Sequence, residues 1–277
     1  MTDSVTNSNY YTDLATKALR NPEEIVGRLC TPLPGLRNLY WNLVPVYYNR
    51  RIKTDYDLPI DPFKIVMIDP SRVTRNSART YPPWKDFWNG FGKVMPGDWD
   101  RGRPSLNGAP PHHDLAEHIE GSLLYESMRE HFVEGVPWEQ TEKLQYNFRV
   151  LDENPDSTKY GSREEFLRRY RKFDDLYESI KRDSIQSQRE RAIECGEHSS
   201  FRQATRHEII VDIARDGEIL SARMGTHRLY MAKILGLDSI PVLIQVRHAD
   251  WIDRLTSEFE NQNENTPSCF IESNLLK

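Results

Sequence analysis

The sequence predicts an α+β protein, in which a helical, loop-rich N-terminal half precedes a C-terminal domain with a small mixed sheet. Two observations carry this prediction. Apolar residues recur at helical spacing in 115–133 and in a long charged segment after Ser162. The pattern then becomes extended in Glu208–Ile213, which an Asp216–Gly217 turn and a returning run, Glu218–Ala222, follow.

The composition is that of a folded domain with a polar surface. Of the 277 residues, 38% are hydrophobic and 29% are charged, and the net charge of −5 argues against a surface built throughout for nucleic acid. Cys30, Cys195 and Cys269 are too few and too far apart for a disulfide framework or a zinc site. Without a signal peptide or a membrane-spanning apolar run, we expect a soluble, cytoplasmic protein.

The residue pattern of the N-terminal half predicts short helices and long irregular segments. Asp13–Leu29 predicts two short helices, the second beginning at Pro22, and the proline- and aromatic-rich stretch 31–48 predicts an irregular segment. Lys64–Ile68 predicts a strand, and Arg79–Pro111 a long ordered loop. Packing into a core is favoured over stacking on a base or sugar for the aromatic residues of that loop: Trp84, Phe87, Trp88, Phe91 and Trp99.

Further helices are predicted at 115–133 and 139–151, and Ser162 resembles the start of a capping box for a long charged helix. The linker-like composition of 152–156 places a domain boundary there. The predicted organisation is a helical, aromatic region 1–155, a domain 156–257 and a polar tail 258–277. Within the domain, a polar connector 184–206 precedes the hairpin, and a helix 225–235 and a strand 240–246 follow it.

Several short motifs in order give the region from Phe173 to Trp251 a family resemblance. Leu176-Tyr177-Glu178-Ser179-Ile180-Lys181, the Asp216–Gly217 turn and Gly225-Thr226-His227-Arg228-Leu229 resemble the helix, hairpin turn and phosphate turn of ParB/sulfiredoxin-like domains. The wider family includes nucleotide-binding partition proteins, sulfiredoxins, free-serine kinases and presumed nucleases. The resemblance therefore implies nucleotide or phosphate handling, with no single reaction.

The residues of the turn support phosphate binding on physical grounds. Gly225 allows a ligand to approach the backbone closely, and the first N–H groups of the following helix, at Thr226 and His227, are unpaired donors at the positive end of the helix dipole. Arg228 adds a planar, bidentate donor, and His227 adds a titratable group.

Two positions depart from the family. Met224 stands where many relatives carry an acid, and Thr226 stands where sulfiredoxins carry their catalytic cysteine. Sulfiredoxin chemistry is thereby excluded for lack of a thiolate, and kinase chemistry lacks its usual acid. Asp212 and Glu208 are the candidate carboxylates for a general base, with His227 as the third candidate catalytic group.

Arg247 and His248 directly follow the last predicted strand and are further candidate phosphate ligands, although His248 could instead cap the next helix. The segment His112-His113-Asp114 with Glu117 and His118 has the residue types of a metal site, but an N-cap role for Asp114 is favoured, so no metal ligands are predicted. The run 163–171 is interpreted as a solvated face, with nucleic-acid contact as the alternative.

The sequence thus predicts a nucleotide- or phosphate-binding protein, for which a phosphotransferase or nucleotide hydrolase activity would fit. Mg²⁺ would accompany a nucleoside di- or triphosphate. Two alternatives stay open. One is a ParB-type module that binds or processes DNA, against which the acidic net charge weighs. The other is an inactive interaction scaffold, which Met224 favours.

Overall fold

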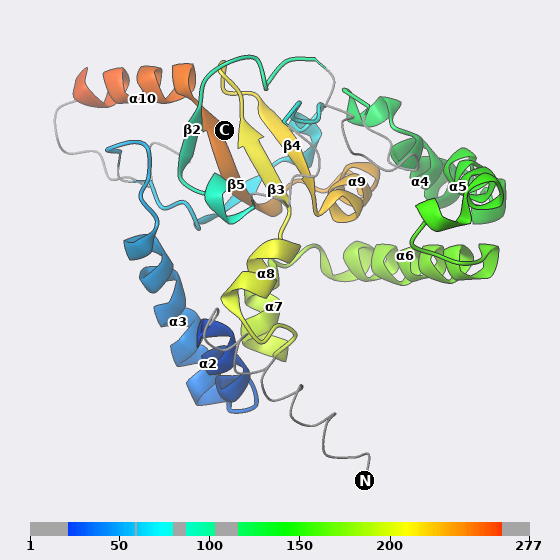
Figure 1. The fold of residues 1–277 in the computed structure, drawn as a ribbon, viewed down its shortest axis with the longest axis horizontal. Coiled ribbons are helices and arrows are strands. Elements are labelled where there is room, and N and C mark those ends of the chain that lie inside the picture. Colours follow the sequence, from blue (N-terminus) through cyan, green and yellow to red (C-terminus); the bar gives the residue numbers. More distant parts are fainter. Residues whose placement is uncertain (1–21, 59, 80–86, 103–115, 262–277) are drawn as a thin grey trace, which may run out of the picture. The chain divides into compact units, whose positions relative to one another are not determined.

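The computed structural model describes residues 22–58, 60–79, 87–102 and 116–261, and it has the predicted α+β fold. The chain divides into two compact units (Figure 1). We call residues 1–52 and 186–208 the helical unit, and residues 53–185 and 209–277 the sheet unit. Neither unit ends at the boundary predicted near residue 155, because strands from both sides of that position join one sheet.

The helical unit contains α2 (Pro22–Cys30), α3 (Pro34–Arg51), α7 (Gln188–Cys195) and α8 (Phe201–His207). The predicted helix start at Pro22 is confirmed, whereas 13–21 lies outside the described residues. The polar connector 184–206, for which the sequence analysis named no helix, contains both α7 and α8. Ser187 forms a full capping box with Glu190, and the Ser200 hydroxyl accepts the Gln203 N–H, so short local caps start both helices.

The prediction of an irregular segment at 31–48 is wrong, because this stretch forms most of α3. Pro34 is compatible with the first turn of a helix, but Pro45 lies inside it and has no N–H to donate to the carbonyl of Trp41. That carbonyl instead accepts a hydrogen bond from Arg189 Nη2 at 3.4 Å. A partner on α7 thus compensates for the proline. Trp41 is 1% exposed, and the Tyr48 ring stacks on Phe201 at 5.0 Å.

The sheet unit is built on five strands: β1 (Ile65–Ile68), β2 (Lys93–Met95), β3 (Ile210–Ile213), β4 (Ile219–Met224) and β5 (Ile240–His248). The order is β1-β5-β3-β4, and β2 also pairs with β5. β5 is antiparallel to β1 but parallel to β2 and β3, and β3 and β4 form the predicted hairpin. All nine residues of β5 are buried, as expected for a central strand.

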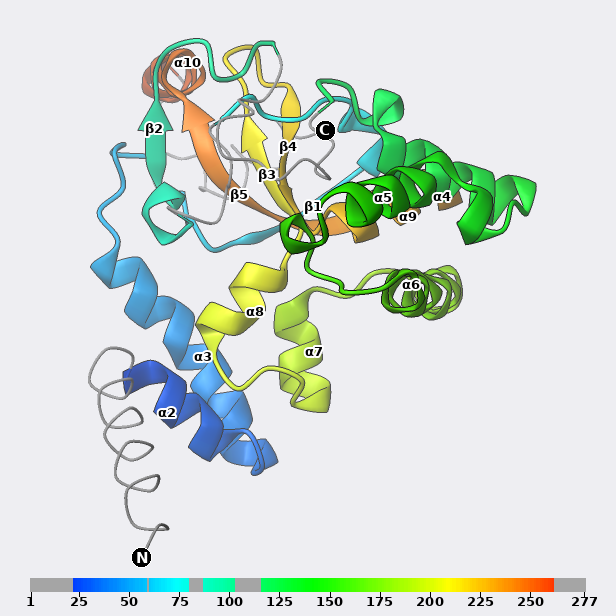
Figure 2. The same cartoon turned by 45° about the vertical axis from the view of Figure 1, so that its right-hand side comes forward.

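Helices lie on two sides of this sheet, α10 (Ala249–Asn261) near β2 and the others as a group beyond β4 (Figure 2). The others are α4 (Leu123–Glu134), α5 (Glu142–Glu153), α6 (Arg163–Asp183) and α9 (Thr226–Leu235), and short 3₁₀ turns lie at 70–72, 88–90, 119–121, 138–140 and 155–157. α10 packs along β5 and β2, whereas α9 packs against α4 and α6. The Ser162 hydroxyl caps α6 by accepting the Glu165 N–H at 3.2 Å, as predicted. The Glu165 carboxylate accepts the Gly161 N–H instead of closing the predicted capping box.

The predicted long loop 79–111 is described only in part, and it contributes the unpredicted strand β2. Phe87 and Phe91 are 1% exposed and pack on each other, and Phe91 also packs on Phe63, which confirms the expected core role for these two residues. Trp88 and Trp99 are half-buried. Trp84 lies outside the described residues. Within the described ranges, no helix is long and apolar enough to cross a membrane, and Cys30 and Cys195 are free thiols.

Candidate functional site: the Gly225 turn

The turn at residues 225–228, called here the Gly225 turn, joins β4 to α9. Gly225 has a φ of 70°, in the left-handed region that favours glycine, and it is the N-cap of α9. The first hydrogen bonds of the helix run from the N–H groups of Arg228 and Leu229 to the Gly225 carbonyl, both at 3.1 Å. The N–H groups of Thr226 and His227 precede these bonds at the positive end of the helix.

His227 lies in a positive environment within this turn. Its ring is partly buried and stacks on Phe173 of α6, with ring centroids 4.4 Å apart. Burial, followed by the nearby guanidinium groups of Arg169 and Arg228, lowers the pKa of His227 to about 4. The imidazole is therefore neutral at pH 7, and an anion bound beside it would relieve the repulsion that opposes its protonation.

Arg169 is the basic group of the turn that sequence reasoning missed. It is exposed on α6, and its guanidinium lies 4.8 Å from the centre of the Phe173 ring, the ring on which His227 stacks. In the sequence it belonged to the run 163–171, interpreted as a solvated face. Arg169 and Phe173 are four residues apart, so the sequence alone could place them on one face of a helix. It could not show that Phe173 contacts His227, because that contact depends on the packing of α6 against α9.

A second arginine reaches the turn from the strand. Arg223 has a φ of 62°, which is unusual for a residue with a side chain and marks local strain immediately before Met224 and Gly225. Its N–H donates to the Ser221 hydroxyl at 3.1 Å, and its Nη2 donates to the carbonyl of Arg79. These bonds hold the end of β4 in the conformation that leads into the turn.

Asp212 lies in the middle of β3 and is engaged in what we call the strand network, Arg79, Asp212 and Gln245. Its carboxylate, fully buried, accepts Arg79 Nη1 at 2.9 and 3.1 Å and the Val246 N–H at 3.1 Å. Arg79 also donates to Gln245 Oε1 at 2.8 Å, and Gln245 Nε2 donates to the Phe87 carbonyl at 2.7 Å. The network ties the chain around residues 79 and 87 to the sheet, so the geometry gives Asp212 a structural function.

Glu208, the other predicted carboxylate, belongs to the helical unit. It is 1% exposed and ends α8, and its Oε1 accepts the N–H of Arg189 in the first turn of α7 at 3.0 Å. A carboxylate at a helix N-terminus stabilises the helix through its free N–H groups and its dipole. Glu208 thus acts as a buried helix cap.

The sheet separates Arg247 and His248 from the Gly225 turn. Ile213, which pairs with Arg247, also pairs with Ile219 at the start of β4, while Gly225 follows the other end of β4. Five residues of strand, roughly 16 Å at 3.3 Å per residue, lie between the two ends. Arg247 is 1% exposed, and its guanidinium lies 5.7 Å from the centre of the Tyr56 ring. The structure therefore does not join these residues to the predicted phosphate cradle.

His248 instead belongs to what we call the hairpin network, Asp98, Asp100, Arg215 and His248. Its Nε2 donates to the Gly97 carbonyl at 2.8 Å, and its Nδ1 accepts the Asp250 N–H at 3.1 Å, so it caps α10, the alternative that the sequence left open. It is 2% exposed and stacks on Trp99. Both ring nitrogens are thus satisfied by the backbone.

Asp100 and Arg215 form the centre of the hairpin network. Arg215 Nη2 lies 2.7 Å from Asp100 Oδ1, and the Arg215 N–H donates to Asp100 Oδ2 at 3.0 Å. Burial by itself would raise the pKa of Asp100, but the hydrogen bonds from Arg215 outweigh it and hold the pKa at about 2. The Gly97-Asp98-Trp99-Asp100 segment therefore anchors a loop to the hairpin.

A divalent metal does not fit the predicted carboxylates. The Asp212 carboxylate accepts an arginine and a backbone N–H, and Glu208 caps a helix in the other unit. No cluster of three His, Cys, Asp or Glu side chains with the arrangement of a metal site occurs among the described residues, and His112, His113 and Asp114 fall outside them. Glu117 lies 3.7 Å from Arg75, and His118 pairs with Arg75 in an isolated β-bridge.

Comparisons with known proteins found no match of this chain to a family model, a curated protein or a solved structure. The ParB/sulfiredoxin-like resemblance accordingly stays a prediction from the motifs, and the function is argued from the site alone.

Proposed function

We propose that the Gly225 turn binds a phosphate group of a nucleotide or of another phosphorylated small molecule. The observation that carries the proposal is the position of two arginines near His227 at the start of a helix. Arg228 is the next residue of α9, and Arg169 lies over the Phe173 ring on which His227 stacks. A phosphate there would accept the N–H groups of Thr226 and His227 and would offset the charge of both arginines.

The proposal is one of binding and assigns no reaction. A phosphotransferase or hydrolase would need a base that can reach the acceptor hydroxyl or water. Asp212 is engaged in the strand network, and Glu208 is engaged as a helix cap. His227 is neutral near pH 7, and we assign it no catalytic role. Its pKa should instead change when an anion binds.

Calorimetry and thermal unfolding with ATP, ADP, CTP, GTP and tripolyphosphate, each with and without Mg²⁺, test the proposal. We expect at least one of them to bind wild type, and we expect Arg228→Ala and Arg169→Ala to weaken binding by about tenfold or more, because charge-assisted hydrogen bonds contribute about 1.5–3 kcal/mol. Arg168→Ala is the matched control, since Arg168 is an exposed arginine next to Arg169 on α6.

A second readout follows His227 directly. Phosphate binding should raise the pKa of the His227 imidazole above its value of about 4, which NMR titration of the ring carbons measures. Absence of binding by every compound at millimolar concentration would overturn the proposal. So would equal binding by wild type and a folded Arg228→Ala variant. Binding of duplex DNA with a steep salt dependence, without nucleotide binding, would favour the DNA-binding alternative instead.

A further inference from the structure

The helix α3 has apolar side chains on two neighbouring faces, one buried and one exposed. The inner face, with Tyr40, Trp41 and Val44, is buried within the helical unit. The outer face carries Leu36, Leu39, Leu43 and Val46, which are 46% to 59% exposed. A helix that is apolar on both faces normally buries both, so the outer face lacks a partner within the described residues.

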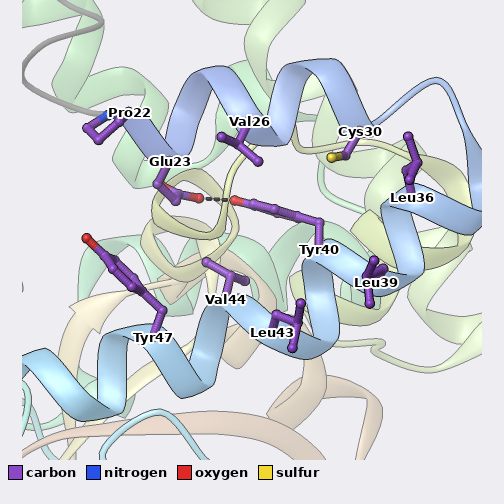
Figure 3. A pocket seen from close by; sticks show the side chains of 10 residues that line it. All are labelled: Pro22, Glu23, Val26, Cys30, Leu36, Leu39, Tyr40, Leu43, Val44 and Tyr47. Carbon is purple, nitrogen blue, oxygen red and sulfur yellow. Dashed lines mark hydrogen bonds between the residues drawn. The ribbon is translucent and has the colours of Figure 1, made fainter.

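The exposed surface continues onto α2 and forms a groove. Val26 and Leu29 of α2 are 49% and 70% exposed, while Gly27 faces inward, where an added Cβ would lie 1.8 Å from the Ser199 carbonyl oxygen. Side chains of α2 and α3 line this groove (Figure 3). Its volume is about 410 Å³. The hydrogen bond from the Tyr40 hydroxyl to Glu23 joins the two helices along one side of it.

We propose that this α2/α3 surface binds the same surface of a second copy of the chain. The four outer-face residues of α3, from Leu36 to Val46, are separated by three, four and three residues, so their spacing is the same in either chain direction. Two antiparallel α3 helices related by a twofold axis would then place Leu39 against Leu43 of the other copy, and Leu36 against Val46. This self-complementarity favours a second copy over an unrelated partner.

The size and border of the surface are also those of an interface. Within residues 25–47, nine large apolar side chains are 40% to 70% exposed. Together they present an area on the order of 800 Å², about what one partner contributes to a standard protein interface. Charged residues, the Glu24–Arg28 ion pair and Arg50 and Arg51, lie at its margins, in the arrangement of an apolar centre with a polar rim.

Sedimentation of the full-length chain across a range of concentrations tests the proposal. We expect a dimer, and we expect Leu39→Glu combined with Leu43→Glu to raise its dissociation constant by about a hundredfold or more, because four carboxylates would meet at the centre of the interface. Val133→Glu is the control, since Val133 is a 61% exposed apolar residue on α4 and should leave the dimer unchanged. Circular dichroism verifies that each variant folds.

Cross-linking tests the antiparallel register. A mixture of Leu39→Cys chains and separately tagged Leu43→Cys chains should give a mixed disulfide dimer, beyond the background from the three native cysteines in wild type. A monomeric wild-type chain at high micromolar concentration would overturn the proposal, as would a dimer that the double variant leaves intact. A chain that is monomeric and dimerises only after removal of residues 1–21 would also overturn the proposal. It would indicate that the N-terminal segment of the same chain covers the outer face of α3.

Discussion

The Gly225 turn and the hairpin network lie at opposite ends of β4, and their polar groups are used differently. In the hairpin network, both nitrogens of His248 are hydrogen-bonded, and Asp100 is bound by Arg215 through its backbone and its guanidinium. At the Gly225 turn, Arg169 and Arg228 lie near His227, whose ring makes no hydrogen bond within the part of the chain that the structure describes. In the hairpin network the carboxylates of Asp98 and Asp100 pair with Arg215, whereas at the Gly225 turn burial and two nearby guanidinium groups keep the His227 imidazole neutral.

The strand network between these ends gives the largest expected effect. Asp212→Ala should lower the free energy of unfolding by about 3–5 kcal/mol, because it leaves the guanidinium of Arg79 and the buried N–H of Val246 without the carboxylate. Urea denaturation measures this loss. Asp183→Ala is the control, since Asp183 forms an exposed ion pair with Arg182, and its removal should change stability little. Equal losses would mean that the network is not structural.

The pH dependence of the free energy of unfolding tests the environment of His227 in the Gly225 turn. Its pKa is about 4 in the folded chain and near 6.5 when unfolded, so the unfolded state takes up the proton first as the pH falls. Stability should therefore decrease from about pH 6.5 to about pH 4, by at most about 3 kcal/mol. His227→Gln should remove this decrease, whereas His118→Gln, at an exposed histidine, should keep it. Denaturant titrations at each pH measure the difference.

Asp100 should show its effect in a more acidic window. Its folded pKa of about 2 lies below the ordinary value, so the Asp100–Arg215 interaction stabilises the protein above about pH 4 and is lost as the pH falls towards 2. Asp100→Asn should lower stability at pH 7 and remove this part of the acid loss. If wild type and variant lost stability in parallel below pH 4, the hairpin network would not be the neutralised cluster described above.

The smallest expected change in stability concerns Gly225 itself. Gly225→Ala should cost about 1 kcal/mol, because alanine is strained at a positive φ. The same change should weaken phosphate binding, since the added methyl group would stand where the ligand approaches the backbone. Gly121→Ala is the control, because a Cβ at that position meets no atom within 4 Å and φ is not positive there. If Gly225→Ala left phosphate binding unchanged, the Gly225 turn would not be the place where phosphate binds.

The parts of the fold that depend on neighbouring residues could be predicted from the sequence. Ser162 starts α6, Asp216 and Gly217 form the hairpin turn, and Gly225 starts α9, because each acts through hydrogen bonds or dihedral angles within a few residues. The continuation of α3 through Pro45 could not be predicted, since the donor that compensates for the proline is Arg189, which is far away in sequence.

By itself, the sequence determined the α+β class, the β3–β4 hairpin and a glycine at a helix start beside Arg228, all of which rest on local periodicity and conformational preference. Tertiary structure alone decided which polar residues share a site. Pairing in the sheet placed Arg247 and His248 at the far end of the strands, and the packing of α6 on α9 brought Arg169 and Phe173 to His227. The physical reason is that strand direction and helix packing set distances between residues that lie far apart in the chain.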